Sequence, residues 1–243
     1  MEIVVQPSKN GRYKYLLLFI TTMHDILDVI TSRRSIKRFL PKFMDWEKLS
    51  RILDAARHAP SSGNLQNWKF ILIMDPEKKQ KIAEAAYEQY DMALAAALIV
   101  VCGESEKAER YYGEQGSTYT IENCAAAVQN MLLEAQSLGL GSLWVGAFSG
   151  DDVRTGCGIP EGVQPRAIVA IGYAAEVPEK PPKYPLENLL YFGSWRNKLK
   201  DPAKYMVDIA SILERRAQNV KEMAQETVKT VAKTTEKLVK REK

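Results

Sequence analysis

Four basic side chains crowd around one serine in the stretch TSRRSIKRFLP, residues 31–41. If the chain is extended here, Arg33, Ser35 and Lys37 point to one side and Arg34 points to the other. An arginine fork and a lysine point charge beside a hydroxyl suit a phosphate group. The alternative is a solvated basic helix end, where cations are favoured by the helix dipole. The spacing alone leaves both interpretations open.

A second set of polar groups lies in PSSGNLQNW, residues 60–68, on a predicted loop between a helix and a buried strand. Asparagine and glutamine each carry a donor and an acceptor, so Asn64 and Gln66 could bind the edge of a planar heterocycle. Ser61 and Ser62 add two hydroxyls. A simple turn with Asn and Ser caps explains the same residues. Taken singly, each residue favours the turn.

The stretch GLGSLWVGAF, residues 139–148, is rich in glycine but is not a dinucleotide-binding fingerprint. Trp144 stands where the third glycine of GxGxxG would be, and the stretch follows a predicted helix instead of a strand. Gly146 and Ala147 would let a flat ring approach the main chain closely. The stretch therefore offers a bare backbone beside an aromatic side chain.

The composition bounds the class of protein and the kinds of site. The 243 residues are 46% hydrophobic and 26% charged, which is ordinary for a globular protein. The net charge is only +4, and no basic tract is interleaved with aromatics, so we expect no nucleic-acid partner. The three cysteines and two histidines form no CxxC, HExxH or similar cluster, so we expect neither a disulfide framework nor a metal site. A Ser/His triad is also weakly supported, because no GxSxG elbow is present.

Hydrophobic periodicity predicts several helices and a few separated strands. Strict βαβ alternation is absent, so the predicted class is α+β. The first strand of the set is mostly apolar, as is the second, so both are expected to be buried on their two faces. Asp151 and Asp152 are expected to cap a helical turn. The predicted helices span residues 23–32, 46–58, 76–90 and 121–138, and the predicted strands span residues 68–74, 97–102, 142–148 and 165–173.

The two ends of the chain differ from its centre, which gives three predicted parts: residues 1–22, 23–200 and 201–243. The apolar run YLLLFI, residues 15–20, follows basic residues like a signal peptide, but it is short and lacks a cleavage site. It is either an element packed on the core or part of an over-long start before Met23. No segment is long enough to span a bilayer, so we expect a cytoplasmic protein.

Residues 201–243 are rich in Lys, Glu, Ala and Thr and have apolar residues near a 3.5-residue spacing. One long helix is predicted there. It could pack on its own chain, on a partner subunit or on an anionic surface such as a membrane, or remain solvated.

Five segments in the same order resemble the FMN-dependent nitroreductase family, over a region from about Met23 to Trp195. The resemblance implies a homodimer with a central, mostly antiparallel sheet flanked by helices and with FMN at the subunit interface. The five segments are RRSIKRF (33–39), PSSGNLQNW (60–68), QNMLL (129–133), GLGSLWVGAF (139–148), and IPEGVQPRAIVAIGY (159–173) followed by KPPKYPLE (180–187).

The resemblance also implies roles for individual residues. The first segment would hold the FMN phosphate and ribityl chain, with a backbone and pyrimidine-edge contact from its second arginine. The PSSxNxQ loop would reach the flavin of the other subunit, and Asn67, which replaces the usual proline, is expected to loosen the exit of this loop. The WVGA segment would lie over the reactive N5 atom, and a later lysine would close on the phosphate. The residues concerned are Arg33, Arg34, Ser35 and Lys37; Pro60, Ser61, Ser62, Asn64 and Gln66; Val145, Gly146 and Ala147; and Lys183.

The activity that the resemblance implies is electron transfer from NADH or NADPH through flavin N5 to a small acceptor, typically a nitroaromatic or a quinone. Both substrates would use one open face in a ping-pong cycle, which needs no Rossmann domain and no catalytic acid or base, so no catalytic residue is predicted. Related branches carry out dehalogenation, enoate reduction or flavin destruction on the same fold. A flavin-binding module without catalysis is a further alternative.

Overall fold

The computed structural model describes residues 5–7, 13–15 and 25–198, and the chain divides into two compact units, Met1–Lys180 and Pro181–Lys243. In the first unit, β1 (Val5–Pro7) pairs with β2 (Tyr13–Tyr15) in an antiparallel ribbon. The second unit contains one short helix, α7 (Leu186–Leu189), within its described residues. The predicted long helix of residues 201–243 and most of the apolar run at residues 15–20 lie outside the described residues.

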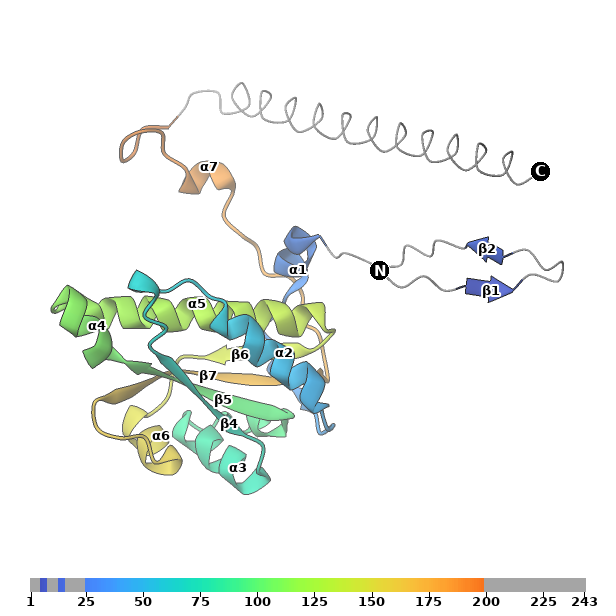
Figure 1. Ribbon diagram of the computed structural model, residues 1–243, viewed down its shortest axis with the longest axis horizontal. Coiled ribbons are helices and arrows are strands. Elements are labelled where there is room, and N and C mark those ends of the chain that lie inside the picture. The colour runs from blue at the N-terminus through green and yellow to red at the C-terminus, as the bar shows by residue number, and fades with distance from the viewer. Residues whose placement is uncertain (1–4, 8–12, 16–24, 199–243) are drawn as a thin grey trace, which may run out of the picture. The chain divides into compact units, whose positions relative to one another are not determined.

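Five strands form the central sheet: β3 (Phe39–Leu40), β4 (Trp68–Ile73), β5 (Ala97–Glu104), β6 (Gly141–Val145) and β7 (Val163–Ala174). Their order is β3-β7-β5-β4, and β6 also pairs with β7 (Figure 1). Every pair is antiparallel, and β7 pairs with three strands, β3, β5 and β6. This confirms the predicted α+β class with a mostly antiparallel sheet.

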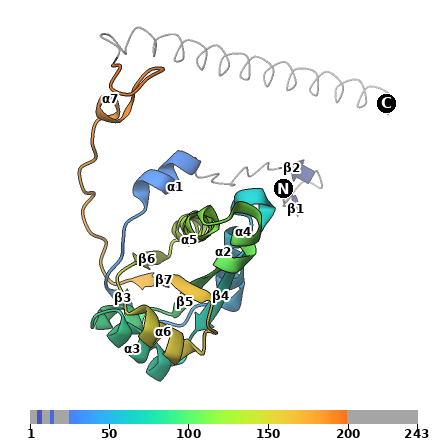
Figure 2. The same ribbon diagram turned by 90° about the vertical axis from the view of Figure 1, so that its left-hand side faces the viewer.

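The two faces of the sheet carry separate cores because successive side chains of a strand point to opposite faces. On one face, Ile99 and Val101 of β5 pack with α2 (Trp46–Arg57) and α5 (Gln115–Ser137). On the other face, Leu98 and Val100 pack with α3 (Pro76–Ala85) and α6 (Gly150–Cys157). Figures 1 and 2 show these helix pairs on opposite sides of the sheet.

The prediction that two strands are buried on both faces holds for only one of them. β5 lies between β4 and β7 and is buried from Ala97 to Gly103. In β4 only Trp68 and Ile73, at its two ends, are buried. β4 pairs with β5 alone among the described strands, and the edge position leaves its middle residues partly open to solvent.

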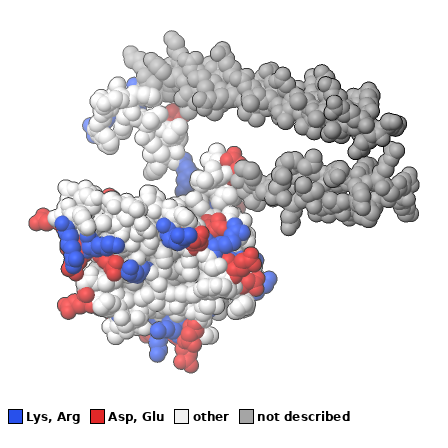
Figure 3. All heavy atoms as spheres, in the orientation of Figure 1, with Lys and Arg blue, Asp and Glu red and all other residues white. Residues whose placement is uncertain are grey.

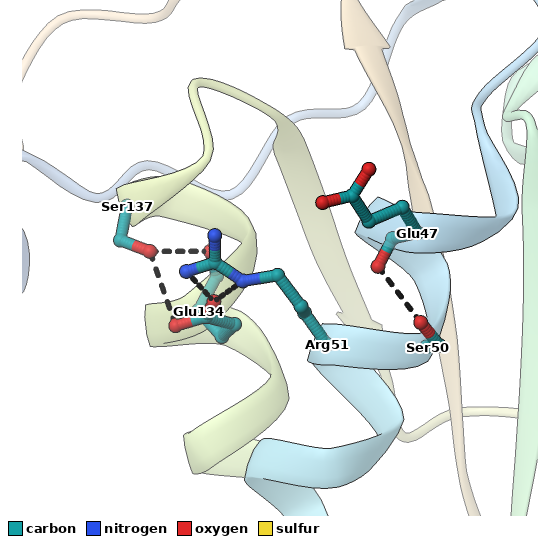
Figure 4. Close-up of polar contacts among 5 residues, drawn as sticks. All are labelled: Glu47, Ser50, Arg51, Glu134 and Ser137. Carbon is teal, nitrogen blue, oxygen red and sulfur yellow. Dashed lines mark hydrogen bonds and ion pairs between the residues drawn. The ribbon is translucent and has the colours of Figure 1, made fainter. Parts of the chain in front are cut away.

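α2 begins and ends within a residue of its prediction, and it buries Leu49, Ile52 and Ala56. It packs beside α5, and an ion pair spans their surface (Figure 4). The Arg51 guanidinium lies 2.7 Å from Glu134 Oε1, and the Ser137 hydroxyl donates to Glu134 Oε2 at 3.1 Å. The pair is exposed on the Arg51 side, so its contribution to stability is small, about 0–1 kcal/mol.

Three other helix predictions need correction. α5 begins at Gln115, six residues before the expected start, and α4 (Ser105–Tyr112) was not predicted. α3 ends at Ala85 instead of 90, and a 3-10 turn, η2 (Tyr90–Leu94), follows. α6 is capped by Ser149, whose hydroxyl accepts from the Asp152 N–H; both predicted caps, Asp151 and Asp152, lie in its first turn.

The first predicted helix appears as α1 (Ile26–Ser32), capped by the Asp25 carboxylate. Among residues 25–198, no helix is both long and apolar enough to cross a bilayer.

Candidate functional site

The basic segment leaves α1 as an extended strand-like stretch that joins the sheet. Arg33 is the C-cap of α1, with an extended backbone, φ −55° and ψ 136°. The next residues bridge to β6, where the Ile36 N–H donates to the Ser142 carbonyl at 3.0 Å. Ile36 is buried, whereas Ser35 and Lys37 are exposed. The side chains therefore alternate as an extended chain requires, with the serine and the lysine on the open side.

Arg34 acts on the helix end. Its Nη1 donates to the carbonyls of Thr31, Ser32 and Arg33 at 3.0, 2.9 and 3.0 Å. These carbonyls belong to the last turn of α1, where a cation is favoured by the dipole. Arg34 thus fits the helix-end interpretation, which had been open for the whole cluster.

A hollow beside Arg34 contains a lysine that was not predicted. Lys180 lines this hollow with Asp28, Ser32 and Gln136, between the end of α1 and the end of α5. The lysine proposed from the resemblance, Lys183, belongs to the second unit and stays a prediction. Lys180 is the first residue of KPPKYPLE, directly before two prolines. Nothing in the sequence distinguishes it from the other basic residues nearby.

Lys37 lies on the other side of the segment, at a hollow of about 420 Å³. The hollow is walled by Leu143 of β6 and by Met92 and its neighbours in residues 88–92. Gln89 Nε2 donates to the Ala147 carbonyl at 3.5 Å, so this wall also touches the WVGA stretch. Two of the predicted segments therefore meet at one hollow.

The wall of residues 88–92 was missed because a helix was predicted through residue 90. Tyr87 and Glu88 have left-handed backbones, φ 55° and 62°, which turn the chain after α3. Asp91 lies 3.7 Å from Arg38 Nε, so the wall carries a partly neutralised carboxylate. Desolvation, together with nearby Glu88 and Glu84, raises the pKa of the Tyr90 hydroxyl, which stays protonated at neutral pH.

The WVGA stretch ends β6 with a change from buried to open positions. Val145 is buried, and Gly146 and Ala147 are exposed beside the partly exposed ring of Trp144. A Cβ at Gly146 would meet only Trp144 Nε1, at 3.9 Å. The backbone there is open to a flat ligand, as predicted for this stretch.

The loop after α2 is held away from that hollow. The Ser62 N–H and hydroxyl both donate to Asn123 Oδ1 of α5, at 2.9 and 3.2 Å. The Gln66 N–H donates to Ser61 Oγ at 3.0 Å, and Gln66 Nε2 donates to Asn64 Oδ1 at 3.0 Å. Asn64 and Gln66 are exposed, as is Pro60.

Asn67 does not loosen the exit of this loop, contrary to the prediction. It is fully buried, and its side chain bonds to Glu104, Thr120 and Asn123. The partners are distant in the sequence, so the residue type alone could not reveal them. A proline at this position would offer none of these bonds.

Within one chain, the loop and the basic segment are far apart. Ser62 attaches to α5 at Asn123, whereas Ser32 accepts a bond from Gln136, thirteen residues farther along α5. At 1.5 Å per residue, that is about 20 Å. Figure 1 shows α4 and α1 over opposite ends of α5. Within one chain Lys37 lines the hollow and Ala147 is bonded to its wall through Gln89, but none of the loop residues lines it.

Charges of both signs are interspersed on the face of the molecule that Figure 3 shows. This agrees with a net charge of only +4. The described part of the chain therefore shows no extended positive surface on that face.

Comparisons with known proteins give one consistent result. The family model described as "Nitroreductase family" matches residues 30–104 and 87–173, more than half of the chain. A protein of Archaeoglobus fulgidus with the provisional name NADH dehydrogenase/NAD(P)H nitroreductase is 35% identical over 155 residues, 62% of this chain and 86% of that protein. The NADPH-flavin oxidoreductase of Vibrio harveyi is 26% identical over 208 residues, 82% of this chain and 87% of that protein.

A solved structure has the same fold. The structure of NADPH:FMN oxidoreductase from Vibrio harveyi complexed with NAD+ matches with a TM-score of 0.65 and 22% identity, over 77% of this chain and 85% of the other. The family-model match spans the basic segment, the loop, the wall of the hollow and β6 and β7. The chain belongs to the nitroreductase family.

Proposed function

We propose that this protein is an FMN-dependent oxidoreductase that passes electrons from NADH or NADPH to a small acceptor. The proposal rests on one observation: the extended segment after α1 is bridged to β6, so that Lys37 and Leu143 line one hollow, and Gln89 of its wall bonds to the Ala147 carbonyl. The relatives support it, because their names describe NADPH, flavin and nitroreductase activities.

The residues present fit FMN in size and in chemistry. The hollow of about 420 Å³ lies within the usual range for small-molecule sites. Ser35 and Lys37 offer a hydroxyl and an ammonium on the open side of the segment, beside Arg33. These donors suit a phosphate and a polyol chain. Open space at Gly146 suits a flat ring. Bound FMN supplies the hydride-accepting and electron-donating chemistry.

In this proposal each protein group binds or orients. Arg33, Ser35 and Lys37 hold the phosphate and ribityl chain, with Arg33 and Lys37 supplying two positive charges. The stretch Val145–Ala147 covers the reactive edge of the ring with backbone groups. No side chain is assigned as an acid or a base.

The site is completed by a second copy of the chain. About 20 Å of α5 separates the points where the loop and the end of α1 attach to it, so we infer that Asn64 and Gln66 serve the flavin of another subunit. We therefore propose a homodimer in which Pro60, Ser61, Ser62, Asn64 and Gln66 of one subunit close the site of the other. Arg34 contributes by holding the end of α1.

Both substrates would use the same open face in turn, which makes the cycle ping-pong, with a nitroaromatic or a quinone as acceptor. Initial rates at several fixed quinone concentrations test this. We expect parallel lines when reciprocal rate is plotted against reciprocal NADPH concentration. Intersecting lines would mean that both substrates bind together, which excludes a shared face. The cytoplasmic location and the role of residues 201–243 stay predictions.

A further inference from the structure

A buried polar network lies beneath the loop of residues 61–66. At its centre is Asn67, which is fully buried. Its Nδ2 donates to the Glu104 carbonyl at 3.0 Å and to Thr120 Oγ1 at 2.8 Å, and its Oδ1 accepts from Asn123 Nδ2 at 2.8 Å. Both amide hydrogens and the amide oxygen are therefore satisfied by β5 and α5.

The network continues to the start of the loop. Asn123 is 4% exposed, and its Oδ1 accepts from both the N–H and the hydroxyl of Ser62. At the far end, the Thr120 hydroxyl donates to the Gly116 carbonyl at 2.7 Å. A continuous set of buried hydrogen bonds thus runs from the backbone of α5 to Ser62. Buried networks of this kind fix one geometry when every member has a partner.

The loop above the network has a conformation that needs such support. Gly63, Asn64 and Gln66 all have left-handed backbones, with φ of 54°, 56° and 47°. Non-glycine residues keep this conformation only when their surroundings hold them there. A proline at position 67 would push Gln66 into an extended conformation. An asparagine at position 67 therefore allows the left-handed conformation of Gln66, and its buried side chain anchors the end of the loop.

We propose that Asn67 and Asn123 are positioning residues of the flavin site. They hold the loop in its left-handed form so that the exposed side chains of Asn64 and Gln66 meet the flavin bound to the partner subunit. Neither buried asparagine touches the flavin. This inference rests on the proposed function, in which the loop completes the FMN site of a second copy.

The test uses Asn67→Ser and Asn123→Ser in the full-length protein. Serine shortens the side chain and leaves a polar space that a water molecule can fill, which favours retention of the fold. The FMN dissociation constant is measured by flavin fluorescence at a temperature where circular dichroism shows each variant folded. Because two loop side chains lose their preorganisation, we expect each variant to raise the constant by about tenfold. Having two variants keeps the test decisive if one of them fails to fold.

Ile52→Val is the matched control. Ile52 is fully buried in the core with α5 and does not belong to the loop. This variant should lower the melting temperature and leave the FMN dissociation constant unchanged. A merely structural role for the network would make the two serine variants behave like this control, and that result would overturn the proposal.

A double-mutant comparison shows whether the effect passes through the loop. In an Asn64→Ala/Gln66→Ala background, Asn67→Ser should cause no further loss of FMN affinity. An equal tenfold loss in both backgrounds would overturn the positioning role. If the Asn64→Ala/Gln66→Ala variant itself binds FMN like the wild type, the assignment of the loop in the proposed function is wrong. If that variant weakens binding and folded Asn67→Ser does not, only the positioning role is refuted.

Discussion

Arg33→Ala should weaken FMN binding without unfolding the protein. Arg33 caps α1 through its backbone N–H, which donates to the Val29 carbonyl at 3.2 Å, and alanine keeps this bond. Among the residues that the structure describes, no ion pair to the Arg33 guanidinium is present. Truncation should therefore change the stability of the apoprotein little, and any effect on FMN reports on the phosphate.

The size of the effect follows from the chemistry of a charged hydrogen bond. Such a bond contributes roughly 1.5–3 kcal/mol, and 1.4 kcal/mol is about tenfold in a dissociation constant. The FMN dissociation constant should rise by about 10- to 150-fold. At an FMN concentration about 100 times the wild-type constant, FMN stabilises the wild type by about 2.7 kcal/mol, and a tenfold weaker variant loses roughly half of this.

The assay is a fluorescence titration of apoprotein with FMN, followed by melting curves at one fixed FMN concentration. Arg57→Ala is the control, because Arg57 is an exposed arginine of α2 that pairs with Asp54 and lies outside the site. It should leave the FMN constant unchanged. An Arg33→Ala protein that binds FMN as tightly as the wild type would remove Arg33 from the phosphate site.

Three further outcomes are expected. Gly63→Ala should lower the free energy of unfolding by about 1–2 kcal/mol in chemical denaturation, because φ of Gly63 is +54° and the new Cβ would lie 2.6 Å from Tyr112 Oη. An unchanged denaturation midpoint would show that the loop relaxes freely. At pH 8.5, iodoacetamide should leave Cys102 and Cys124 unmodified, because burial raises their pKa values to about 12 and about 11 and so keeps both as thiols. Cys157, which is only partly buried, is the internal reference. Labelling of Cys102 and Cys124 in the native protein would contradict their burial. Removal of FMN should lower the melting temperature, and adding it back should restore it in a concentration-dependent way, whereas identical apo and holo melting would contradict FMN binding by the folded protein.

The parts of the fold that the sequence predicts well are those with regular local patterns. α2 has an acidic cap position and apolar residues on one face, and its bounds differ from the prediction by only one residue. β5 is a continuous apolar run and lies in the middle of the sheet. β4 has a similar run but lies at the edge among the described strands, since strand order depends on distant pairing.

The errors arise where local patterns are weak or where partners are distant. The first turns of α5 contain Gly116 and polar residues, so no apolar face marks them, and Gly113 with φ 58° separates them from α4. Asn67 looked like a weakened loop exit because its partners, Thr120 and Asn123, lie 53 and 56 positions away. No spacing rule connects residues at that distance.

The candidate site likewise has parts that local sequence patterns indicate and parts that depend on the folded structure. The alternation of Ser35, Ile36 and Lys37 is the one expected for an extended chain, but the sequence left a helix end equally open at this segment. The wall of the hollow at residues 88–92 depends on two left-handed residues after α3, which helix propensity cannot indicate. The separation of the loop from the basic segment depends on the length of α5, which becomes known only in the structure, and the proposal of a second subunit is argued from that separation.

The central claim is that this chain binds FMN at the hollow beside Lys37 and reduces it with a nicotinamide. The most direct measurement is the visible spectrum of the purified, FMN-supplemented protein, before and after adding NADH or NADPH without oxygen. We expect protein-bound flavin absorption bands that bleach on addition of one of the two nucleotides. A protein that takes up no FMN, or whose bound flavin keeps its bands with both nucleotides, would contradict this account.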